Sequence, residues 1–119
     1  MKIGELARRA GVSRRMLRYY EQEGLLQPAR TESGYRNYGE AEVQTAQRIR
    51  MLSSAGLKVE TIRVLLPCML GDQPIFEPCR EVRTVLHREV ETLDEKLRDL
   101  SESRKIIKSY LHGLAPTGN

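Results

Sequence analysis

Apolar side chains recur at helical spacing through most of this chain and predict a mainly α fold. Two short helices are expected first, over residues 3–10 and 14–22. Gly11 ends the first because glycine readily adopts the positive φ of a helix C-terminal cap. Ser13 is a good N-cap for the second. The core face of the second helix is expected to contain Met16, Leu17 and Tyr20.

Residues 27–38 interrupt the helical pattern. Pro28 prevents a helix from continuing, and Ser33-Gly34 is a turn signal. Tyr35 and Tyr38 favour extended structure on the far side of that turn. We therefore expect a small β-hairpin, which beside two short helices is interpreted as a wing. Two more helices are expected over residues 40–55 and 59–66.

Residues 67–78 contain three prolines and one glycine and are expected to form a loop. A loop of that length in a compact domain usually has a function or a partner. Cys68 and Cys79 bracket it, and each directly follows a proline.

The last predicted element is a helix over residues 80–112, a stretch without proline or glycine. At about 1.5 Å per residue it would be roughly 50 Å long. Its apolar positions alternate in steps of four and three, which is a heptad pattern interrupted by Arg104. The rest of the chain is too small to cover such a stripe, so we expect a second copy to do so in a homodimer. The predicted interface residues are Leu86, Val90, Leu93, Leu97, Leu100, Ile107 and Leu111.

A chain of 119 residues has room for one domain and an appendage. The net charge of +4 lies entirely in residues 1–54, which carry ten Lys or Arg and six Glu, whereas residues 55–119 carry ten of each sign. Between Leu6 and Tyr20 there are five arginines and no acid. This asymmetry favours a polyanionic partner.

A helix-turn-helix places its second helix in the major groove of double-stranded DNA. Arg14, Arg15, Arg18 and Tyr19 are expected to face outward there and to contact base edges or phosphates. In the wing, backbone contacts to DNA are expected from Arg30, Tyr35, Arg36 and Tyr38.

Several short segments, taken together, are characteristic of a single protein family. Ile3-Gly4-Glu5-Leu6-Ala7, Gly11-Val12-Ser13, Leu17-Arg18-Tyr19-Tyr20-Glu21, Gly24-Leu25 and Gly34-Tyr35-Arg36-Asn37-Tyr38 resemble the DNA-binding head of the MerR (mercury-resistance-regulator) family of bacterial transcription factors.

The resemblance covers roughly residues 1–112, and the long C-terminal helix resembles that family's antiparallel coiled-coil dimerisation helix. It implies a winged helix-turn-helix head over residues 1–66, a linker or effector loop over 67–79, the dimerisation helix over 80–112 and a flexible tail over 113–119. It also implies major-groove contacts from Arg15, Arg18 and Tyr19. The implied mechanism is a homodimer that bends and untwists an overlong promoter spacer so that RNA polymerase can engage both promoter elements.

The sequence offers several candidate features for sensing a signal. The chain ends at Asn119, so we expect no separate ligand-binding domain. Cys79 matches the position of a metal-sensing cysteine in the family, but the tail has no further cysteine and the four-cysteine run of a cluster-binding member is absent. At a helix N-terminus, near Arg80, the Cys79 thiolate is favoured. It could react with an electrophile such as an aldehyde or form a disulfide with Cys68.

Other interpretations stay open. The two cysteines could instead be buried apolar residues, or a weak two-thiol metal site completed by His87 or by residues across the dimer. A DNA-architectural or excisionase-like protein is a further alternative. No constellation typical of an enzyme is present, so we expect neither catalysis nor a cofactor. The absence of a signal peptide and of a long apolar run predicts a cytoplasmic protein without membrane contact.

Overall fold

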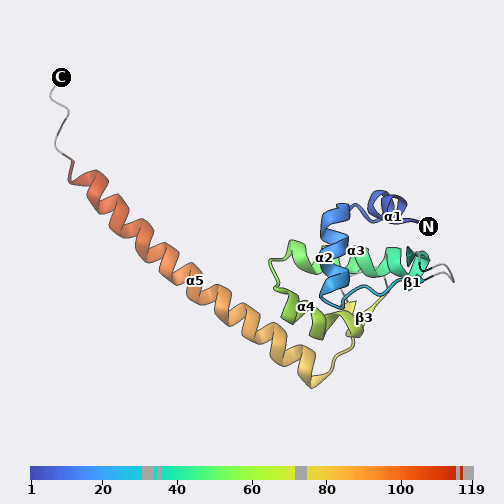
Figure 1. Cartoon of the computed structure of the whole chain (residues 1–119). Helices are drawn as coiled ribbons and strands as arrows, with labels where there is room; N and C mark the ends of the chain where they lie inside the picture. Colours follow the sequence, from blue (N-terminus) through green and yellow to red (C-terminus); the bar gives the residue numbers. More distant parts are fainter. Residues whose placement is uncertain (31–33, 35, 72–74, 115, 117–119) are drawn as a thin grey trace. The chain divides into compact units, whose positions relative to one another are not determined.

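The computed structural model describes residues 1–30, 34, 36–71, 75–114 and 116 (Figure 1). The chain divides into two compact units, Met1–Val82 and Arg83–Asn119. Within them the helices are α1 (Ile3–Ala10), α2 (Arg14–Gln22), α3 (Glu40–Ser54), α4 (Val59–Leu65), the 3-10 turn η1 (Leu66–Cys68) and α5 (Arg80–His112). The mainly helical fold expected from the sequence is confirmed.

The turn between α1 and α2 is built as predicted. Gly11 has φ +70°, and its N–H donates to the Ala7 carbonyl at 3.0 Å, which closes α1. Ser13 caps α2 because its hydroxyl accepts a hydrogen bond from the Met16 N–H at 3.1 Å. The predicted core position of Met16 is wrong, since that side chain is 38% exposed. The inward face of so short a helix is narrow, and Met16 lies at its edge.

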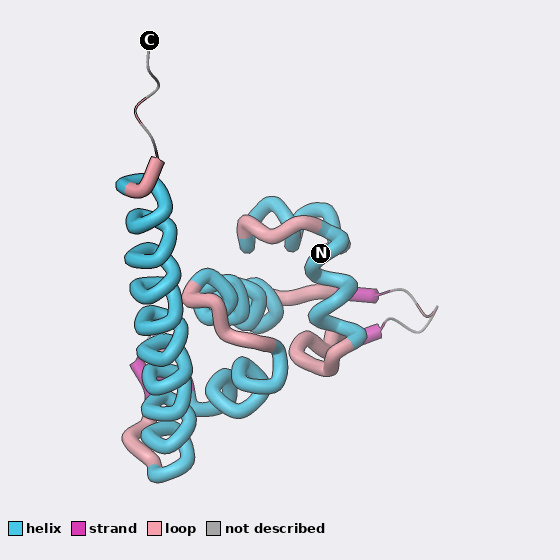
Figure 2. Tube along the Cα trace, turned by 90° about the vertical axis from the view of Figure 1, so that its left-hand side faces the viewer, coloured by secondary structure: helices cyan, strands magenta, loops and turns pink. Residues whose placement is uncertain are grey.

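The predicted wing is an antiparallel pair of two-residue strands, β1 (Ala29–Arg30) and β2 (Arg36–Asn37). Ala29 pairs with Asn37 and Arg30 with Arg36. Gly34 in the connecting turn has φ +84°, a conformation that favours glycine. Tyr35 and Ser33 lie outside the described residues. Figure 2 shows the two strands side by side.

The core of the first unit forms around α3. This helix buries one residue per turn, namely Val43, Ala46, Ile49 and Leu52. Helix α1 packs against it with Leu6, and α4 adds Ile62 and Leu65. No side-chain nitrogen or oxygen buried among the described residues lacks a hydrogen-bond partner. The first unit is therefore a small support for α2 and the wing, with an apolar core built around α3.

The segment expected to be an irregular loop contains a second hairpin. Strands β3 (Met69–Leu70) and β4 (Ile75–Phe76) pair antiparallel, with Met69 opposite Phe76. Gly71 has φ +66° directly after β3, which allows the chain to turn. Pro67 and Pro78 lie outside the paired residues, so neither removes a strand hydrogen bond.

Helix α5 is a single helix of 33 residues, as predicted (Figure 2). Val82 at its start is buried in the first unit. In the second unit the heptad stripe is exposed along its whole length, from 36% at Leu86 to 67% at Leu100. Within the described part of the chain, no helix is both long and apolar enough to cross a membrane.

Candidate DNA-binding interface and thiol pair

Helix α2 presents two chemically different faces. Leu17 and Tyr20 are 1% and 5% exposed and hold the helix on the core. The Tyr19 ring packs beside that of Tyr20, with centroids 6.2 Å apart, and is 41% exposed. The outward face carries the side chains that the sequence assigned to DNA: Arg14, Arg15, Arg18 and Tyr19. The structure thus gathers these four on one exposed surface of one helix.

The C-terminal end of α2 is fixed by a contact from α4. The guanidinium of Arg63 donates to the carbonyl of Glu23, the residue that caps α2, at 2.7 Å. The backbone N–H of Leu25 donates to the Tyr20 carbonyl at 2.9 Å and completes the last turn. Helix α2 is therefore held at its start by Ser13 and at its end by Arg63.

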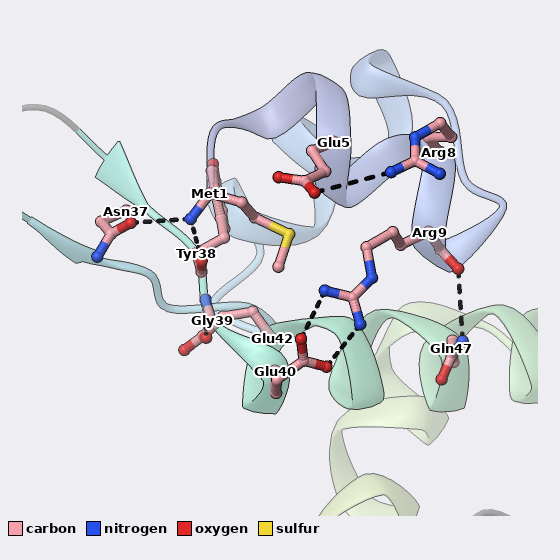
Figure 3. A network of polar contacts seen from close by, with 10 residues as sticks. All are labelled: Met1, Glu5, Arg8, Arg9, Asn37, Tyr38, Gly39, Glu40, Glu42 and Gln47. Atoms are coloured by element: carbon pink, nitrogen blue, oxygen red, sulfur yellow. Dashed lines mark hydrogen bonds and ion pairs between the residues drawn. The ribbon is translucent and has the colours of Figure 1, made fainter.

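The wing is attached to the head through the first residue of the chain (Figure 3). Met1 and Tyr38 exchange backbone hydrogen bonds at 2.9 and 2.6 Å, and the Met1 ammonium also donates to Asn37 Oδ1 at 3.0 Å. Tyr38 is only 2% exposed. The expected phosphate contact from Tyr38 is corrected accordingly, because its ring lies in the core. Arg30 and Arg36 stand opposite each other in the strands, and Tyr35 lies outside the described residues.

A second polar network joins α1 to α3 (Figure 3). Arg9 Nη1 and Nη2 donate to the two carboxylate oxygens of Glu40 at 2.5 and 2.7 Å. The hydrogen bond from Arg9 lowers the pKa of Glu40, and the same contact raises the pKa of Arg9. The Glu42 carboxylate accepts from the Gly39 N–H at 2.7 Å, which caps the first turn of α3.

The two cysteines come together at the base of the second hairpin. The Glu77 N–H donates to the Cys68 carbonyl at 2.9 Å and extends the strand pairing. Cys79 lies at the start of α5, where its sulfur accepts a hydrogen bond from the Val82 N–H at 3.4 Å. Both thiols are free and half-buried. The loop of the sequence prediction is therefore a hairpin that brings Cys68 to Cys79.

The electrostatic surroundings distinguish the two thiols. Burial raises the pKa of Cys68, and the charge of Cys79 and a hydrogen bond between the two side chains raise it further. Glu77 and Glu81 act in the same direction. Cys79, in contrast, has the N-terminus of α5 at its sulfur, where a negative charge is favoured. The two thiols therefore differ in their surroundings, Cys68 by its burial and Cys79 by its position at the start of α5.

Three arginines were not singled out from the sequence as structural residues. Arg9 binds Glu40, Arg63 binds the Glu23 carbonyl, and Arg48 donates from Nε and Nη2 to the Gly71 carbonyl at 3.0 and 2.8 Å. No local pattern marks a side chain that binds a distant backbone carbonyl. His87 and His112 are exposed on α5, and the described residues hold no group of three or more His, Cys, Asp or Glu arranged to bind a metal.

A Ser-capped helix with an arginine-rich outer face, carried beside a hairpin wing on a three-helix support, defines a winged helix-turn-helix DNA-binding protein. Comparison with protein families is in agreement. A family model described as "MerR HTH family regulatory protein" matches residues 1–67, and one described as "MerR, DNA binding" matches residues 43–110. The chain belongs to the MerR family of transcriptional regulators.

Individual relatives extend the match over nearly the whole chain. Heavy metal-dependent transcription regulator 2 of Rhizobium meliloti is 37% identical over 117 residues, covering 95% of this chain and 78% of the relative. The lead(II) complex of the transcription regulator PbrR691 from Ralstonia metallidurans superposes with a TM-score of 0.82 at 29% identity, covering 100% of this chain and 91% of that one. The N-terminal part of the Bacillus subtilis multidrug transporter activator MtaN has a TM-score of 0.70 at 28% identity, covering 93% and 97%.

Proposed function

We propose that this regulator binds promoter DNA as a homodimer, with α2 of each copy in the major groove. The observation that carries the proposal is the exposed face of α2, whose three arginines lie opposite the buried Leu17 and Tyr20. Guanidinium groups form bidentate pairs with guanine edges and phosphates. Arg18 and Tyr19, in the middle of the helix, are assigned to base edges, and the wing arginines Arg30 and Arg36 to the DNA backbone.

The homodimer is supported by the stripe on α5. Seven large apolar residues along one helix are between 36% and 67% exposed. A stripe of this length on a monomer would promote aggregation, and a second α5 with the same heptad pattern covers it. Pairing of the helices fixes the separation of two heads, so the dimer binds two half-sites at a set spacing.

The regulatory step is a change in DNA shape. Two heads held by one paired helix can bend and untwist the DNA between them, at a deformation cost of a few kcal/mol that protein–DNA contacts offset. In an overlong promoter spacer this deformation brings the two promoter elements into register for RNA polymerase. The same dimer without the deformation occupies the promoter and represses it.

The signal enters at the thiol pair of Cys68 and Cys79. An electrophile such as an aldehyde adds to the Cys79 thiolate, whose sulfur forms the new S–C bond while the carbonyl oxygen takes up a proton. Alternatively, a peroxide oxidises the pair to a disulfide; the two thiols lose two protons and two electrons, and the peroxide is reduced to water. The contacts that support this assignment are the hydrogen bond from the Val82 N–H to Cys79 Sγ and that from the Glu77 N–H to the Cys68 carbonyl, which hold both cysteines at the base of the hairpin.

A soft metal ion is the second candidate signal. Relatives of this chain are named as heavy metal-dependent regulators, and one similar structure contains lead(II). Two adjacent thiolates suit a soft ion such as Cu(I). In that case Cys68 and Cys79 supply two ligands and any others come from the partner copy.

One experiment tests both parts of the proposal. The protein is footprinted on its own promoter region, and transcription from that promoter is measured with a thiol electrophile, with peroxide and with soft metal ions. We expect a spacer footprint and a response to one of these agents that Cys79→Ser removes, whereas His112→Gln, a surface change on the same helix, preserves it. Footprints outside any promoter spacer would favour the architectural alternative. A normal response from Cys79→Ser would exclude the thiol pair.

A further inference from the structure

A hollow in the first unit is lined by the segment that follows α2 and by the residues that precede Cys68. The hollow has a volume of about 540 Å³ and is bordered by the end of the helix-turn-helix at Leu25, by α3 at Arg48, and by α4 and η1 at Arg63 and Pro67. Besides the apolar core, polar contacts at its rim join segments that are distant in the sequence.

Two arginines at the rim make those contacts. Arg48 on α3 donates twice to the Gly71 carbonyl, at 3.0 and 2.8 Å, and is half-buried. Arg63 on α4 donates to the Glu23 carbonyl at 2.7 Å. Each guanidinium therefore binds a backbone carbonyl, 23 residues away for Arg48 and 40 for Arg63. One contact reaches the hairpin of the thiol pair, and the other reaches the end of α2.

The thiol pair is connected to both arginines through short backbone paths. Cys68 ends η1, which continues directly from α4, the helix that carries Arg63. Cys68 also precedes β3, and Gly71, the acceptor of Arg48, follows that strand. Met69 is buried and attaches the hairpin to the core, and Arg48 adds a polar attachment to α3 through the Gly71 carbonyl. A change in the spacing of Cys68 and Cys79 displaces the hairpin base and η1 together.

We propose that Arg48 and Arg63 are positioning residues that couple the thiol pair to recognition helix α2. Arg48 holds the hairpin on α3, so movement at the thiols is passed to α4 instead of being absorbed by the hairpin. Arg63 passes that movement to the end of α2 through the Glu23 carbonyl. This inference rests on the proposed function of the thiol pair. It adds the route by which modification of a thiol changes the affinity for DNA.

The test measures coupling as a ratio of affinities. The full-length protein is prepared with reduced thiols and with both thiols alkylated by N-ethylmaleimide, and its Kd is measured for a duplex selected by the protein from a randomised library. Coupling between two sites typically changes affinity about 5- to 150-fold. We expect such a ratio for the unmodified sequence and a ratio below about 2 for Arg48→Met and for Arg63→Met, which keep the aliphatic stem but remove the donors.

Arg50→Met is the matched control, because Arg50 lies on the same helix as Arg48 without contacting the hairpin carbonyl. If Arg48 had a purely structural role, Arg48→Met would lower the melting temperature and would weaken DNA binding by the reduced and the alkylated protein equally. The ratio of the two Kd values would then be unchanged. If both Met variants keep the full ratio, the inference is wrong. If Arg48→Met does not fold by circular dichroism, Arg48→Lys, with fewer donors, must give an intermediate ratio. A ratio of one in the unmodified protein would instead overturn the thiol signal itself.

Discussion

Arg9 and Glu40 form a two-pronged ion pair across 31 residues, with both guanidinium nitrogens donating to the two carboxylate oxygens. The pair joins the last turn of α1 to the first turn of α3 (Figure 3). Since α1 carries the turn that leads into α2, this contact helps to fix α2 on its support.

We expect Glu40→Gln to lower the melting temperature at neutral pH. The folded state lowers the pKa of Glu40, so the pair stabilises the fold above the ordinary carboxyl pKa and this contribution is lost as the pH falls through the lowered value. Thermal melts from pH 7 to pH 3 should therefore converge for the two proteins. Glu5→Gln, which removes a 3.7 Å ion pair with Arg8, is the control and should shift the melt less. A pH-independent difference would contradict this assignment.

Arg18→Ala should abolish selective binding while leaving the dimer intact. A bidentate contact to a base pair contributes about 1–3 kcal/mol of discrimination. Affinity for the selected duplex should fall accordingly, whereas affinity for an unrelated duplex should fall much less. Lys96→Ala removes the same charge from α5 and serves as the control. Unchanged gel-shift affinity for Arg18→Ala would show that α2 is not the reading helix.

Tyr19 and Tyr20 are adjacent, but substituting each with alanine should affect a different property, DNA affinity for Tyr19 and stability for Tyr20. Tyr20 is 5% exposed, and truncating a buried aromatic residue typically costs about 3–5 kcal/mol, so Tyr20→Ala should unfold at much lower denaturant. Tyr19 is 41% exposed, so Tyr19→Ala should keep its unfolding midpoint and lose DNA affinity. Urea melts combined with anisotropy separate the two outcomes. Equal loss of stability in both variants would contradict the observed faces of α2.

Leu97→Asp should convert the dimer to a monomer. Leu97 is 64% exposed and sits in the middle of the stripe, where a charge in a paired interface would be left without water. Sedimentation should show a monomer at micromolar concentration, with helix content reduced in α5 only. Asp99→Asn, off the stripe, should remain dimeric. A dimeric Leu97→Asp protein would mean that copies pair through another surface.

Cys79 should be alkylated before Cys68. Burial and the neighbouring Cys79 raise the pKa of Cys68, so its thiolate forms at higher pH. With limiting iodoacetamide, peptide mapping should find the label mainly on Cys79 near neutral pH and on both residues at strongly alkaline pH. Because the folded state favours the protonated Cys68 thiol, that residue's contribution to stability is complete at neutral pH and is lost as the pH rises through its raised pKa. Equal labelling of Cys68 and Cys79 at neutral pH would contradict the expected difference in their reactivity.

The elements that sequence predicted well are those with a local cause. Gly11 and Ser13 mark the helix-turn-helix because a left-handed cap and a hydroxyl N-cap act within a few residues. Helix α5 was equally clear, since its heptad pattern runs from Leu86 to Leu111 and is interrupted only at Arg104. The exposure of Arg14, Arg15 and Arg18 followed from the helical periodicity, once Leu17 and Tyr20 were placed in the core.

Features that depend on distant parts of the chain were missed. Two-residue strands such as β3 and β4 are too short to show alternation, so the second hairpin looked like a loop. Tyr38 could face either way in an equally short wing, and its burial depends on packing that the local pattern does not contain. Arg48 and Arg63 bind carbonyls brought near by the tertiary fold, which no spacing along the chain encodes.

In the homodimer that we propose, the exposed stripe of α5 makes this regulator sensitive to its own abundance. When the chain is scarcer than the dissociation constant of its dimer, the number of paired molecules rises with the square of the number of chains. Promoter occupancy then changes steeply over a narrow range of expression. A cell can thus tune the threshold of the response through synthesis and turnover of one small protein, without altering the thiols or the operator.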